Sequence, residues 1–250
     1  MSTQICQNHD SKIKDLISGK TQYLEIPNIL SHSECNSLSK KILSNYETTS
    51  GPGLTTKIGT SLSSYIYDKT KYFSDAQKSN LFLQNLFSNT NPIDKIQKTV
   101  SQLFQKEITT ATEDEMPYSH CMIRIHKNGD SVHVHRDNCN FEMPDYVVSK
   151  YQNQLSAILY LQSPRTGGEL KIYDKQWSLP DESQRHPEFG YSSSVTDGSN
   201  YAVVSPIAGN LLVLNPNFYH QIEPVLGTKH RISIGFFFAE STDDKLFKWS

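Results

Sequence analysis

The chain has 250 residues, of which 36% are hydrophobic and 20% are charged. A chain of this length and composition can bury a sizeable core, which excludes an intrinsically disordered protein and allows one or two domains. The 24 basic residues nearly balance the 26 acidic residues, giving a net charge of -2. No overall charge therefore attracts the protein to nucleic acid or to an anionic membrane, and we expect neither as a partner. These features leave the oligomeric state unknown.

The four cysteines are Cys6, Cys35, Cys121 and Cys139, and no two of them form a Cys-x-x-Cys pair. This spacing argues against a structural zinc site and against a dithiol redox motif. Free thiols in a reducing compartment are the simplest interpretation. The N-terminal residues contain only scattered apolar side chains, without the continuous apolar run of a signal peptide or a membrane span. We therefore expect a cytoplasmic protein.

The first part of the chain has mainly helical patterns. Residues 1–20 are polar and weakly patterned, which is typical of a loose arm or a short helix, and residues 23–26 are predicted to form a strand. Ser31 stands three residues before Glu34, the spacing of a capping box, and apolar residues then follow at intervals of three and four. An amphipathic helix is therefore predicted to begin just after Ser31.

The next segments alternate between loop and helix patterns. Residues 47–59 are rich in turn-forming residues and predict a mobile loop, while residues 64–67 predict a short strand. Residues 72–87 have the apolar spacing of a helix. Pro92 is favoured in the first turn of a helix, and the apolar spacing that follows it continues to Ile108. We expect one helix over residues 72–87 and another beginning at Pro92.

From residue 119 onward, short runs alternate between apolar and polar residues, which is the period of β-strands. The predicted strands cover residues 119–126, 131–138, 154–161, 169–173, 201–204, 210–214, 218–223 and 231–239. Short strands separated by Gly, Pro and Asn turns are typical of a jelly roll. We predict an α+β fold in a single domain of residues 1–250, with a helical part at about 1–115 supporting a β core at about 119–240.

Residues 174–200 form the longest segment for which no regular structure is predicted. They are polar and contain two prolines and two glycines. Long loops in compact domains often close over active sites. We expect this segment to be a lid that is mobile without substrate.

The residues from 131 to 138 alternate polar and apolar side chains in a run rich in valine, which predicts a strand. His133, His135 and Asp137 then share one face of that strand. An imidazole and a carboxylate two residues apart can approach one metal ion. A His-x-Asp motif alone is a weak signal, because histidines on a polar strand face are often only solvated.

A third potential ligand and a nearby cation occur later in the chain. His220 lies just after a turn at the start of a predicted strand, and Arg231 and Ser233 alternate onto one face of the last one. Two histidines and one carboxylate would form a facial triad, which leaves coordination positions open on Fe(II). The planar guanidinium of Arg231 suits bidentate binding of a carboxylate, with the Ser233 hydroxyl as a second donor.

The order of these motifs, His-x-Asp, Gly-Gly-Glu-Leu, a distal His and Arg-x-Ser, resembles that of the Fe(II)/2-oxoglutarate-dependent oxygenases with a double-stranded β-helix (jelly roll) core. The resemblance covers about residues 119–238 and implies that His135, Asp137 and His220 are the catalytic iron ligands. It also implies that Arg231, with Ser233, binds the distal carboxylate of 2-oxoglutarate. Fe(II) would be the cofactor, with 2-oxoglutarate and O2 as co-substrates. The implied reaction couples decarboxylation of 2-oxoglutarate, to succinate and CO2, with hydroxylation of an unactivated C–H bond.

Within this superfamily, the C-terminal motifs look most like a bacterial group that acts on free amino acids and includes hydroxylases and radical halogenases. The halogenases have a small residue in place of the carboxylate ligand. Asp137 fills that place here, so the resemblance implies hydroxylation of a small molecule, with a free amino acid as the favoured substrate. Acidic residues just upstream of the first core strand are candidates to hold the substrate ammonium. The candidate substrate residues are His133, Asn138, Glu115, Glu113 and Arg124.

Two alternatives remain open. A peptidyl hydroxylase of the prolyl type shares the Asp137-Asn138 pair and the order of the motifs. A non-catalytic metal-binding β-barrel would keep the ligands without the reaction. Nucleic-acid repair, which also occurs in this superfamily, is not expected because no basic groove is evident.

Overall fold

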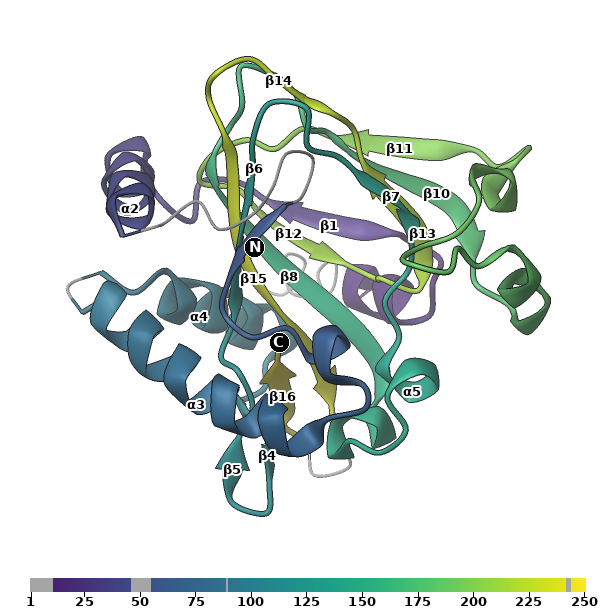
Figure 1. The fold of residues 1–250 in the computed structure, drawn as a ribbon, viewed down its shortest axis with the longest axis horizontal. Helices are drawn as coiled ribbons and strands as arrows, with labels where there is room; N and C mark the ends of the chain where they lie inside the picture. The colour runs from purple at the N-terminus through teal and green to yellow at the C-terminus, as the bar shows by residue number, and fades with distance from the viewer. Residues whose placement is uncertain (1–10, 46–54, 89, 242–243) are drawn as a thin grey trace.

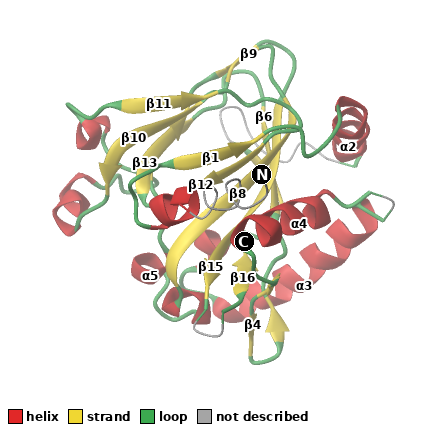
Figure 2. Cartoon of the chain, turned by 180° about the vertical axis from the view of Figure 1, so that it is seen from behind, coloured by secondary structure: helices red, strands yellow, loops and turns green. Residues whose placement is uncertain are grey.

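The computed structural model describes residues 11–45, 55–88, 90–241 and 244–250. A large sheet forms the centre of the molecule, with helices α3 and α4 along one side of it (Figure 1). A smaller sheet of four strands lies away from these two helices, as the view from behind also shows (Figure 2). The site described below lies between the two sheets.

The predicted helices are present, and their caps explain where they begin. Residues 11–17 are helical. Helix α2 (His32–Ser44) begins with the predicted capping box, in which the Ser31 backbone N–H donates to the Glu34 carboxylate at 2.8 Å and the Ser31 hydroxyl accepts from the Glu34 N–H at 3.3 Å. Helix α3 (Lys69–Leu86) begins slightly earlier than predicted, because Asp68 caps it.

Helix α4 (Pro92–Phe104) starts where the proline predicts, but it is shorter than the apolar spacing indicated. Gln105 adopts a left-handed conformation (φ 53°) and ends the helix. Ile108 therefore belongs to strand β3 (Ile108–Thr110), which pairs in parallel with β16. The apolar period alone could not show this break.

Two predictions about the segment before α3 need correction. The short strand predicted at residues 64–67 is wrong, because Leu62–Tyr65 form the 3-10 helix η1. Most of the loop predicted at residues 47–59 lies outside the described residues. Its last part, Thr56–Ile58, is strand β2, which pairs with β6 and is therefore not loop.

The larger sheet takes its strands from both halves of the chain. Its main path runs β1-β12-β8-β15-β16-β3, and β6 pairs with β15 on one side and β2 on the other. Its strands not yet bounded are β1 (Tyr23–Ile26), β6 (Met122–His126), β8 (Gln152–Gln162), β12 (Leu211–Leu214), β15 (Arg231–Glu240) and β16 (Leu246–Trp249). Because β1, β2 and β3 join the same sheet as the β core, the helical part is not separated from it. The single domain over residues 1–250 stays a prediction.

The smaller sheet has the order β11-β10-β13-β7. Its strands are β7 (Val132–His135), β10 (Leu170–Gln176), β11 (Tyr201–Val204) and β13 (Phe218–Ile222). Two short ribbons accompany the sheets, β4 (Thr112–Glu113) with β5 (Met116–Pro117) and β9 (Thr166–Gly167) with β14 (Val225–Leu226). All the strands predicted from residue 119 to residue 239 are confirmed, with ends shifted by a few residues.

Strand alternation separates the core from the site. On β6 and β15, successive side chains point to opposite faces of the sheet. One set is apolar and packs in the core with the helices: Ile123, Ile125, Ile232 and Ile234. The other set is polar and lines a cavity: Arg124, His126, Arg231 and Ser233. The same pattern that builds the core therefore turns the polar set toward the smaller sheet.

The segment from 174 to 200 has more structure than predicted. It contains the 3-10 helices η3 (Leu179–Gln184) and η4 (Ser193–Thr196). Tyr191 and Val195 pack with Val134 of β7 in a small apolar cluster. The segment is thus docked on the smaller sheet, while its mobility stays a prediction. Within the part of the chain that the structure describes, no helix is both long and apolar enough to cross a membrane.

Candidate active site

Two histidines face each other across strands β7 and β13. His135 ends β7 and is the register partner of His220, with 4.2 Å between the ring centroids. Asp137 follows β7, and its Oδ2 lies 3.5 Å from Nε2 of His220. One potential ligand atom from each residue lies within 4.8 Å of the other two. Among the described residues, no other group of three His, Cys, Asp or Glu side chains is placed to hold a metal ion.

Backbone carbonyls fix the orientation of both imidazoles. Nδ1 of His135 lies 2.8 Å from the carbonyl oxygen of His133, and Nδ1 of His220 lies 2.9 Å from that of Phe218. A carbonyl oxygen only accepts hydrogen bonds, so each Nδ1 carries the proton. Each Nε2 then keeps a free lone pair, which is the form that binds a metal ion.

Burial and mutual contacts keep His135 and Asp137 in metal-binding protonation states. Burial, with the nearby His220, lowers the pKa of His135 to about 4. Burial alone would raise the pKa of Asp137, but its contacts with His220 and His135 lower it well below the usual value. At neutral pH the site therefore offers neutral imidazole and ionised carboxylate.

The donor set fits a divalent iron centre. Two imidazole nitrogens and one carboxylate oxygen form the facial triad typical of Fe(II) oxygenases. A structural zinc site would be closed by four protein ligands, which this cluster does not provide. The geometry leaves positions at the metal for a co-substrate and oxygen.

Arg231 lies on the other side of the cavity with only 1% of its surface exposed. Its Nε donates to the carbonyl oxygen of Gly168 at 3.0 Å, and its Nη1 lies 3.5 Å from the Ser233 hydroxyl. The guanidinium also lies over the Tyr160 ring, 5.1 Å from the centroid. Among the described residues, no carboxylate lies within ion-pair distance of it. A buried cation without an anion is costly, so an anionic ligand is expected here.

Gly168 has a role at this position that the sequence did not reveal. It adopts a positive φ of +72°, and an added Cβ would lie 3.1 Å from Cδ of Arg231. The glycine therefore allows its own carbonyl to approach the guanidinium closely. The Gly-Gly-Glu-Leu motif thus positions Arg231 in addition to forming a turn.

A cavity of about 650 Å³ joins the metal ligands to Arg231. Its volume suits a small molecule. Three of the predicted substrate residues, Arg124, His133 and Asn138, line it. Asn138 also caps the short helix α5 (Cys139–Glu142) and donates to Asn217 at 3.2 Å, whereas His133 is exposed and lies outside the ligand cluster.

The two acidic candidates for the substrate ammonium are placed elsewhere. Neither Glu113 nor Glu115 lines the cavity. Glu113 is buried, forms an ion pair with Lys69 and accepts from the Tyr118 hydroxyl at 2.5 Å. Glu115 is exposed beside strand β5. The expectation for these two residues is therefore corrected, because Glu113 holds a structural network together and Glu115 faces solvent.

The structure adds cavity residues that the sequence analysis missed. Lys57 of β2 lies in a run that resembled a loop, and only pairing with β6 turns it toward the site. Glu142 lies in α5, and Phe189 lies in the segment after η3. Residues 55–58, Thr-Thr-Lys-Ile, do not alternate polar with apolar side chains, so no local signal distinguished Lys57. No local signal distinguished Glu142 or Phe189.

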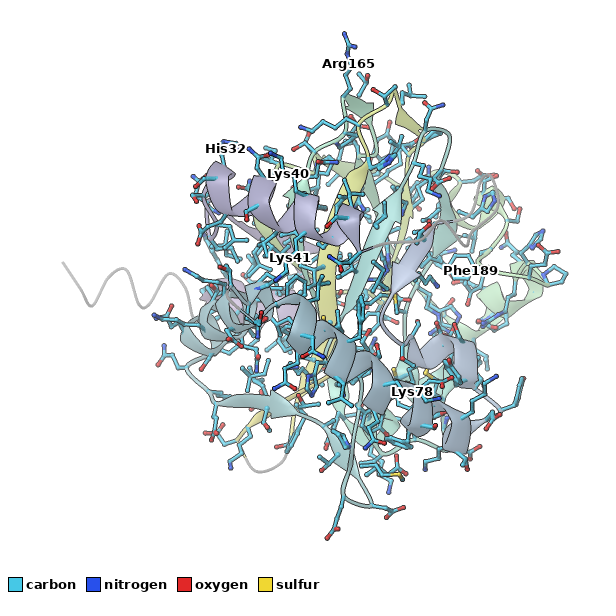
Figure 3. All side chains as sticks on the ribbon, turned by 60° about the vertical axis from the view of Figure 1, so that its left-hand side comes forward. His32, Lys40, Lys41, Lys78, Arg165 and Phe189 are labelled. Carbon is cyan, nitrogen blue, oxygen red and sulfur yellow. The ribbon has the colours of Figure 1, made fainter. Side chains whose placement is uncertain are left out.

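The segment from 174 to 200 reaches the metal ligands. The ring of Phe189 lies 5.0 Å from that of His135, and the Tyr191 N–H donates to the Val134 carbonyl at 2.8 Å. Figure 3 shows Phe189 on the side of the molecule away from Lys40 and Lys41. This segment therefore covers the edge of β7 next to the site.

Arg136, which lies between the ligands His135 and Asp137 in the sequence, also contacts residues 174–200. Its side chain is fully buried, and its guanidinium carbon lies 4.1 Å from the Trp177 ring centroid. The Glu182 carboxylate lies 3.5 Å from Nη2. Strand β7 and residues 174–200 are thus packed together on the side of β7 away from the metal position.

The fold and this site define an Fe(II)/2-oxoglutarate-dependent oxygenase. Residues 1–250 match the family described as carrier-protein-independent halogenase WelO5, and the chain belongs to that family. The enzyme therefore uses Fe(II), 2-oxoglutarate and O2. The predicted superfamily, fold class, enzyme class and cofactors are confirmed, while the roles of individual site residues stay predictions.

Sequence relatives are found in bacterial and fungal proteins. The chain is 25% identical over 200 residues to L-gamma-glutamyl-L-propargylglycine hydroxylase of Streptantibioticus cattleyicolor, covering 78% of this chain and 74% of the relative. It is 27% identical over 164 residues to leucinostatins biosynthesis cluster protein S of Purpureocillium lilacinum, covering 62% and 65% respectively.

Solved structures share the fold at low sequence identity. An N-substituted L-amino acid dioxygenase from Burkholderia ambifaria matches with a TM-score of 0.64 and 13% identity, covering 96% of this chain and 90% of that one. HygX from Streptomyces hygroscopicus, with nickel and 2-oxoglutarate bound, matches with a TM-score of 0.54 and 12% identity, covering 92% and 93%. At these identities the likeness shows the fold alone.

Proposed function

We propose that this enzyme hydroxylates an unactivated C–H bond of a small molecule, with a free amino acid or a close derivative as its substrate. The observation that carries the proposal is the complete carboxylate-containing triad, which faces a buried arginine across one cavity. His135, Asp137 and His220 hold Fe(II), and Arg231 with Ser233 holds the distal carboxylate of 2-oxoglutarate. When bound, the iron supplies the oxidation, in which O2 and 2-oxoglutarate give succinate, CO2 and a hydroxylated substrate.

The protein residues orient the reactants. The Nδ1 bonds to backbone carbonyls hold both imidazoles with Nε2 toward the metal position. The Gly168 carbonyl and the Tyr160 ring hold the guanidinium of Arg231, so its remaining N–H groups can meet a carboxylate. Phe189, beside His135, limits the entry of water at the edge of the site.

Asp137 supports hydroxylation over halogenation, although the family is described by a halogenase. Radical halogenation requires a halide at the metal in the place of the carboxylate ligand. Here that place is filled by an ionised carboxylate that contacts His220. Added chloride should therefore not divert the product.

The substrate class rests on the size and charge of the cavity. Its volume suits a small molecule, and its lining includes both cations and carboxylates, among them Lys57, Arg124, Glu142 and Glu188. A zwitterion can satisfy groups of both signs. The names of two relatives, a hydroxylase of a gamma-glutamyl amino acid compound and a dioxygenase of N-substituted L-amino acids, support the same class.

The proposal extends to a cytoplasmic location and to the kind of partner. The described cysteines Cys35, Cys121 and Cys139 are free and buried, which supports a reducing cytoplasmic location. A near-neutral chain with a small cavity supports a small-molecule substrate without a nucleic-acid or membrane partner. We also propose that residues 1–250 act as one domain.

The test is turnover of defined substrates with iron, 2-oxoglutarate, O2 and chloride. We expect succinate release coupled to the gain of one oxygen atom on a free amino acid or a gamma-glutamyl derivative. Proline- and lysine-containing peptides serve as the comparison. If peptides were hydroxylated while every free amino acid only uncoupled the reaction, the peptidyl hydroxylase would replace this proposal. A chlorinated product would overturn the role given to Asp137.

A further inference from the structure

Two cations lie side by side on neighbouring strands of the cavity wall. Lys57 of β2 and Arg124 of β6 are register partners, and Arg124 is in turn the partner of Ser233 on β15. Lys57, Arg124 and Ser233 all line the cavity. Strand pairing thus places a row of two cations and a hydroxyl across three strands.

Neither cation has an acidic partner in the part of the chain that the structure describes. Among the described residues, no carboxylate lies within ion-pair distance of Lys57 or Arg124, and the Asp137 charge acts on them only from further away. Asp137 already belongs to the metal site. Like charges directly opposite each other on paired strands destabilise a sheet. The protein therefore maintains an unfavourable pair that an anion in the cavity would relieve.

Both cations are accessible to a ligand. Lys57 is exposed and Arg124 is half-buried, unlike the fully buried Arg231. The surrounding protein and the charge of Arg124 together lower the pKa of Lys57, as expected for a lysine held beside another cation in a partly enclosed site. The pair is thus open to solvent through the cavity.

The pair extends beyond the position assigned to 2-oxoglutarate, because Arg124 lies opposite Ser233 and Lys57 lies one strand further out. Arg231 is the register partner of His126, two residues along β6 from Arg124. Lys57 lies one strand further out, close in sequence to the cavity residues Ser61, Leu62 and Ser63. The distal carboxylate of 2-oxoglutarate is assigned to Arg231. The Lys57–Arg124 pair remains available for another anion.

We propose that Lys57 and Arg124 form a second carboxylate-binding subsite, which binds the carboxylate of the organic substrate. This inference rests on the proposed function and adds a specific recognition element to it. Arg124 supplies the planar fork for the carboxylate, and Lys57 adds a second charge from the neighbouring strand. The bound carboxylate holds the substrate on the side of the cavity formed by β2 and β6, while the metal ligands lie on β7 and β13.

Binding to metal-substituted protein tests the subsite without turnover. Zn(II)-loaded protein saturated with 2-oxoglutarate is titrated calorimetrically with the common L-amino acids and with their carboxamides. For each acid that binds the wild type, Arg124→Gln should weaken binding by on the order of tenfold, and Lys57→Gln by a smaller factor. The carboxamides should bind the wild type and both variants equally. Arg165→Gln, an exposed cation outside the cavity, is the matched control.

The possible results distinguish the substrate carboxylate from 2-oxoglutarate as the anion that Lys57 and Arg124 bind. If Arg124→Gln weakened 2-oxoglutarate binding and left the amino acids unaffected, the pair would belong to the co-substrate and the proposal would be overturned. Equal binding of acids by wild type and both variants would also overturn it, while leaving the proposed function intact. If no amino acid bound the wild type, the proposed substrate class itself would fail.

Thermal stability gives an independent measurement on the metal-free protein. If the two cations repel each other, Lys57→Gln at low ionic strength should raise the melting temperature, and added salt should reduce the difference. Arg165→Gln should leave the melting temperature unchanged. A fall in melting temperature for Lys57→Gln would show that Lys57 has a stabilising partner and would overturn the unpaired-cation argument.

Discussion

The two walls of the cavity hold their functional side chains in different ways. On the metal wall, formed by His135, Asp137 and His220, backbone carbonyls fix both imidazoles before any ligand arrives. On the cation wall, formed by Lys57, Arg124 and Arg231, no described residue supplies a carboxylate within ion-pair distance. The metal wall is therefore preorganised by the protein, whereas the cation wall is completed by its ligands.

The largest expected effect is the loss of one metal ligand. His135→Ala or His220→Ala removes one of three donors, and activity should fall by more than ~100-fold, because loss of even an outer partner of a ligand costs about 10- to 100-fold. Iron binding and succinate release measure the effect. His133→Ala, whose side chain lines the cavity outside the ligand cluster, should keep its metal affinity. Unchanged iron-dependent turnover in both ligand variants would refute the assignment of His135 and His220 as iron ligands.

The second largest effect on activity is expected when the buried Arg231 is replaced. Arg231→Ala removes a charge-assisted pair, and the 2-oxoglutarate concentration needed for half-maximal rate should rise by on the order of tenfold or more, at least ~1.4 kcal/mol. Arg231→Lys keeps the charge without the fork and should recover only part of the loss. A wild-type dependence on 2-oxoglutarate in Arg231→Ala would move the anchor to Arg124.

A smaller effect tests how the protein positions Arg231. Gly168→Ala places a Cβ against Cδ of Arg231 at a backbone φ of +72°, so both stability and 2-oxoglutarate affinity should fall, with strain of about 1–3 kcal/mol. Gly129→Ala is the matched control, since Gly129 also has a positive φ but no neighbouring atom of the described residues within 4 Å of its added Cβ. It should lose stability while its 2-oxoglutarate requirement stays unchanged. The same kinetic change in both variants would refute a specific role for Gly168.

The smallest effect concerns the covering segment, residues 174–200. Substrate binding beside Phe189 should order this segment further and slow its amide exchange, because water must be excluded from the site. Hydrogen exchange with and without substrate measures the change. Equal amide protection of residues 174–200 with and without substrate would show that the segment does not close on binding, and would refute the lid.

Sequence patterns predicted the two walls to different extents. The alternation around His135 and Asp137, the turn before His220 and the alternation of Arg231 with Ser233 are local features, and strand pairing then brought them together. Lys57 was missed because β2 has no strand pattern without its partner β6. Glu113 and Glu115 were candidates for the substrate ammonium by resemblance alone, whereas the fold pairs Glu113 with Lys69 and leaves Glu115 exposed.

The fold also shows the difference between features set by local sequence and features set by pairing between distant segments. The N-terminal starts of α2 and α4 were predictable because capping is local, as at Ser31 and Pro92. Ile108 continued a helical spacing but joined a strand, because the backbone at Gln105 turned the chain toward β16. Long-range pairing of this kind leaves no mark within a single segment.

A crystal structure grown without oxygen, with Mn(II) in place of iron and with 2-oxoglutarate bound, tests the central claim most directly. The account predicts the metal on Nε2 of His135, Nε2 of His220 and the Asp137 carboxylate, with the distal carboxylate of 2-oxoglutarate on Arg231. The Lys57–Arg124 pair should remain free of the co-substrate. A fourth protein ligand closing the metal site, or 2-oxoglutarate bound to Lys57 and Arg124, would contradict the division between the two walls.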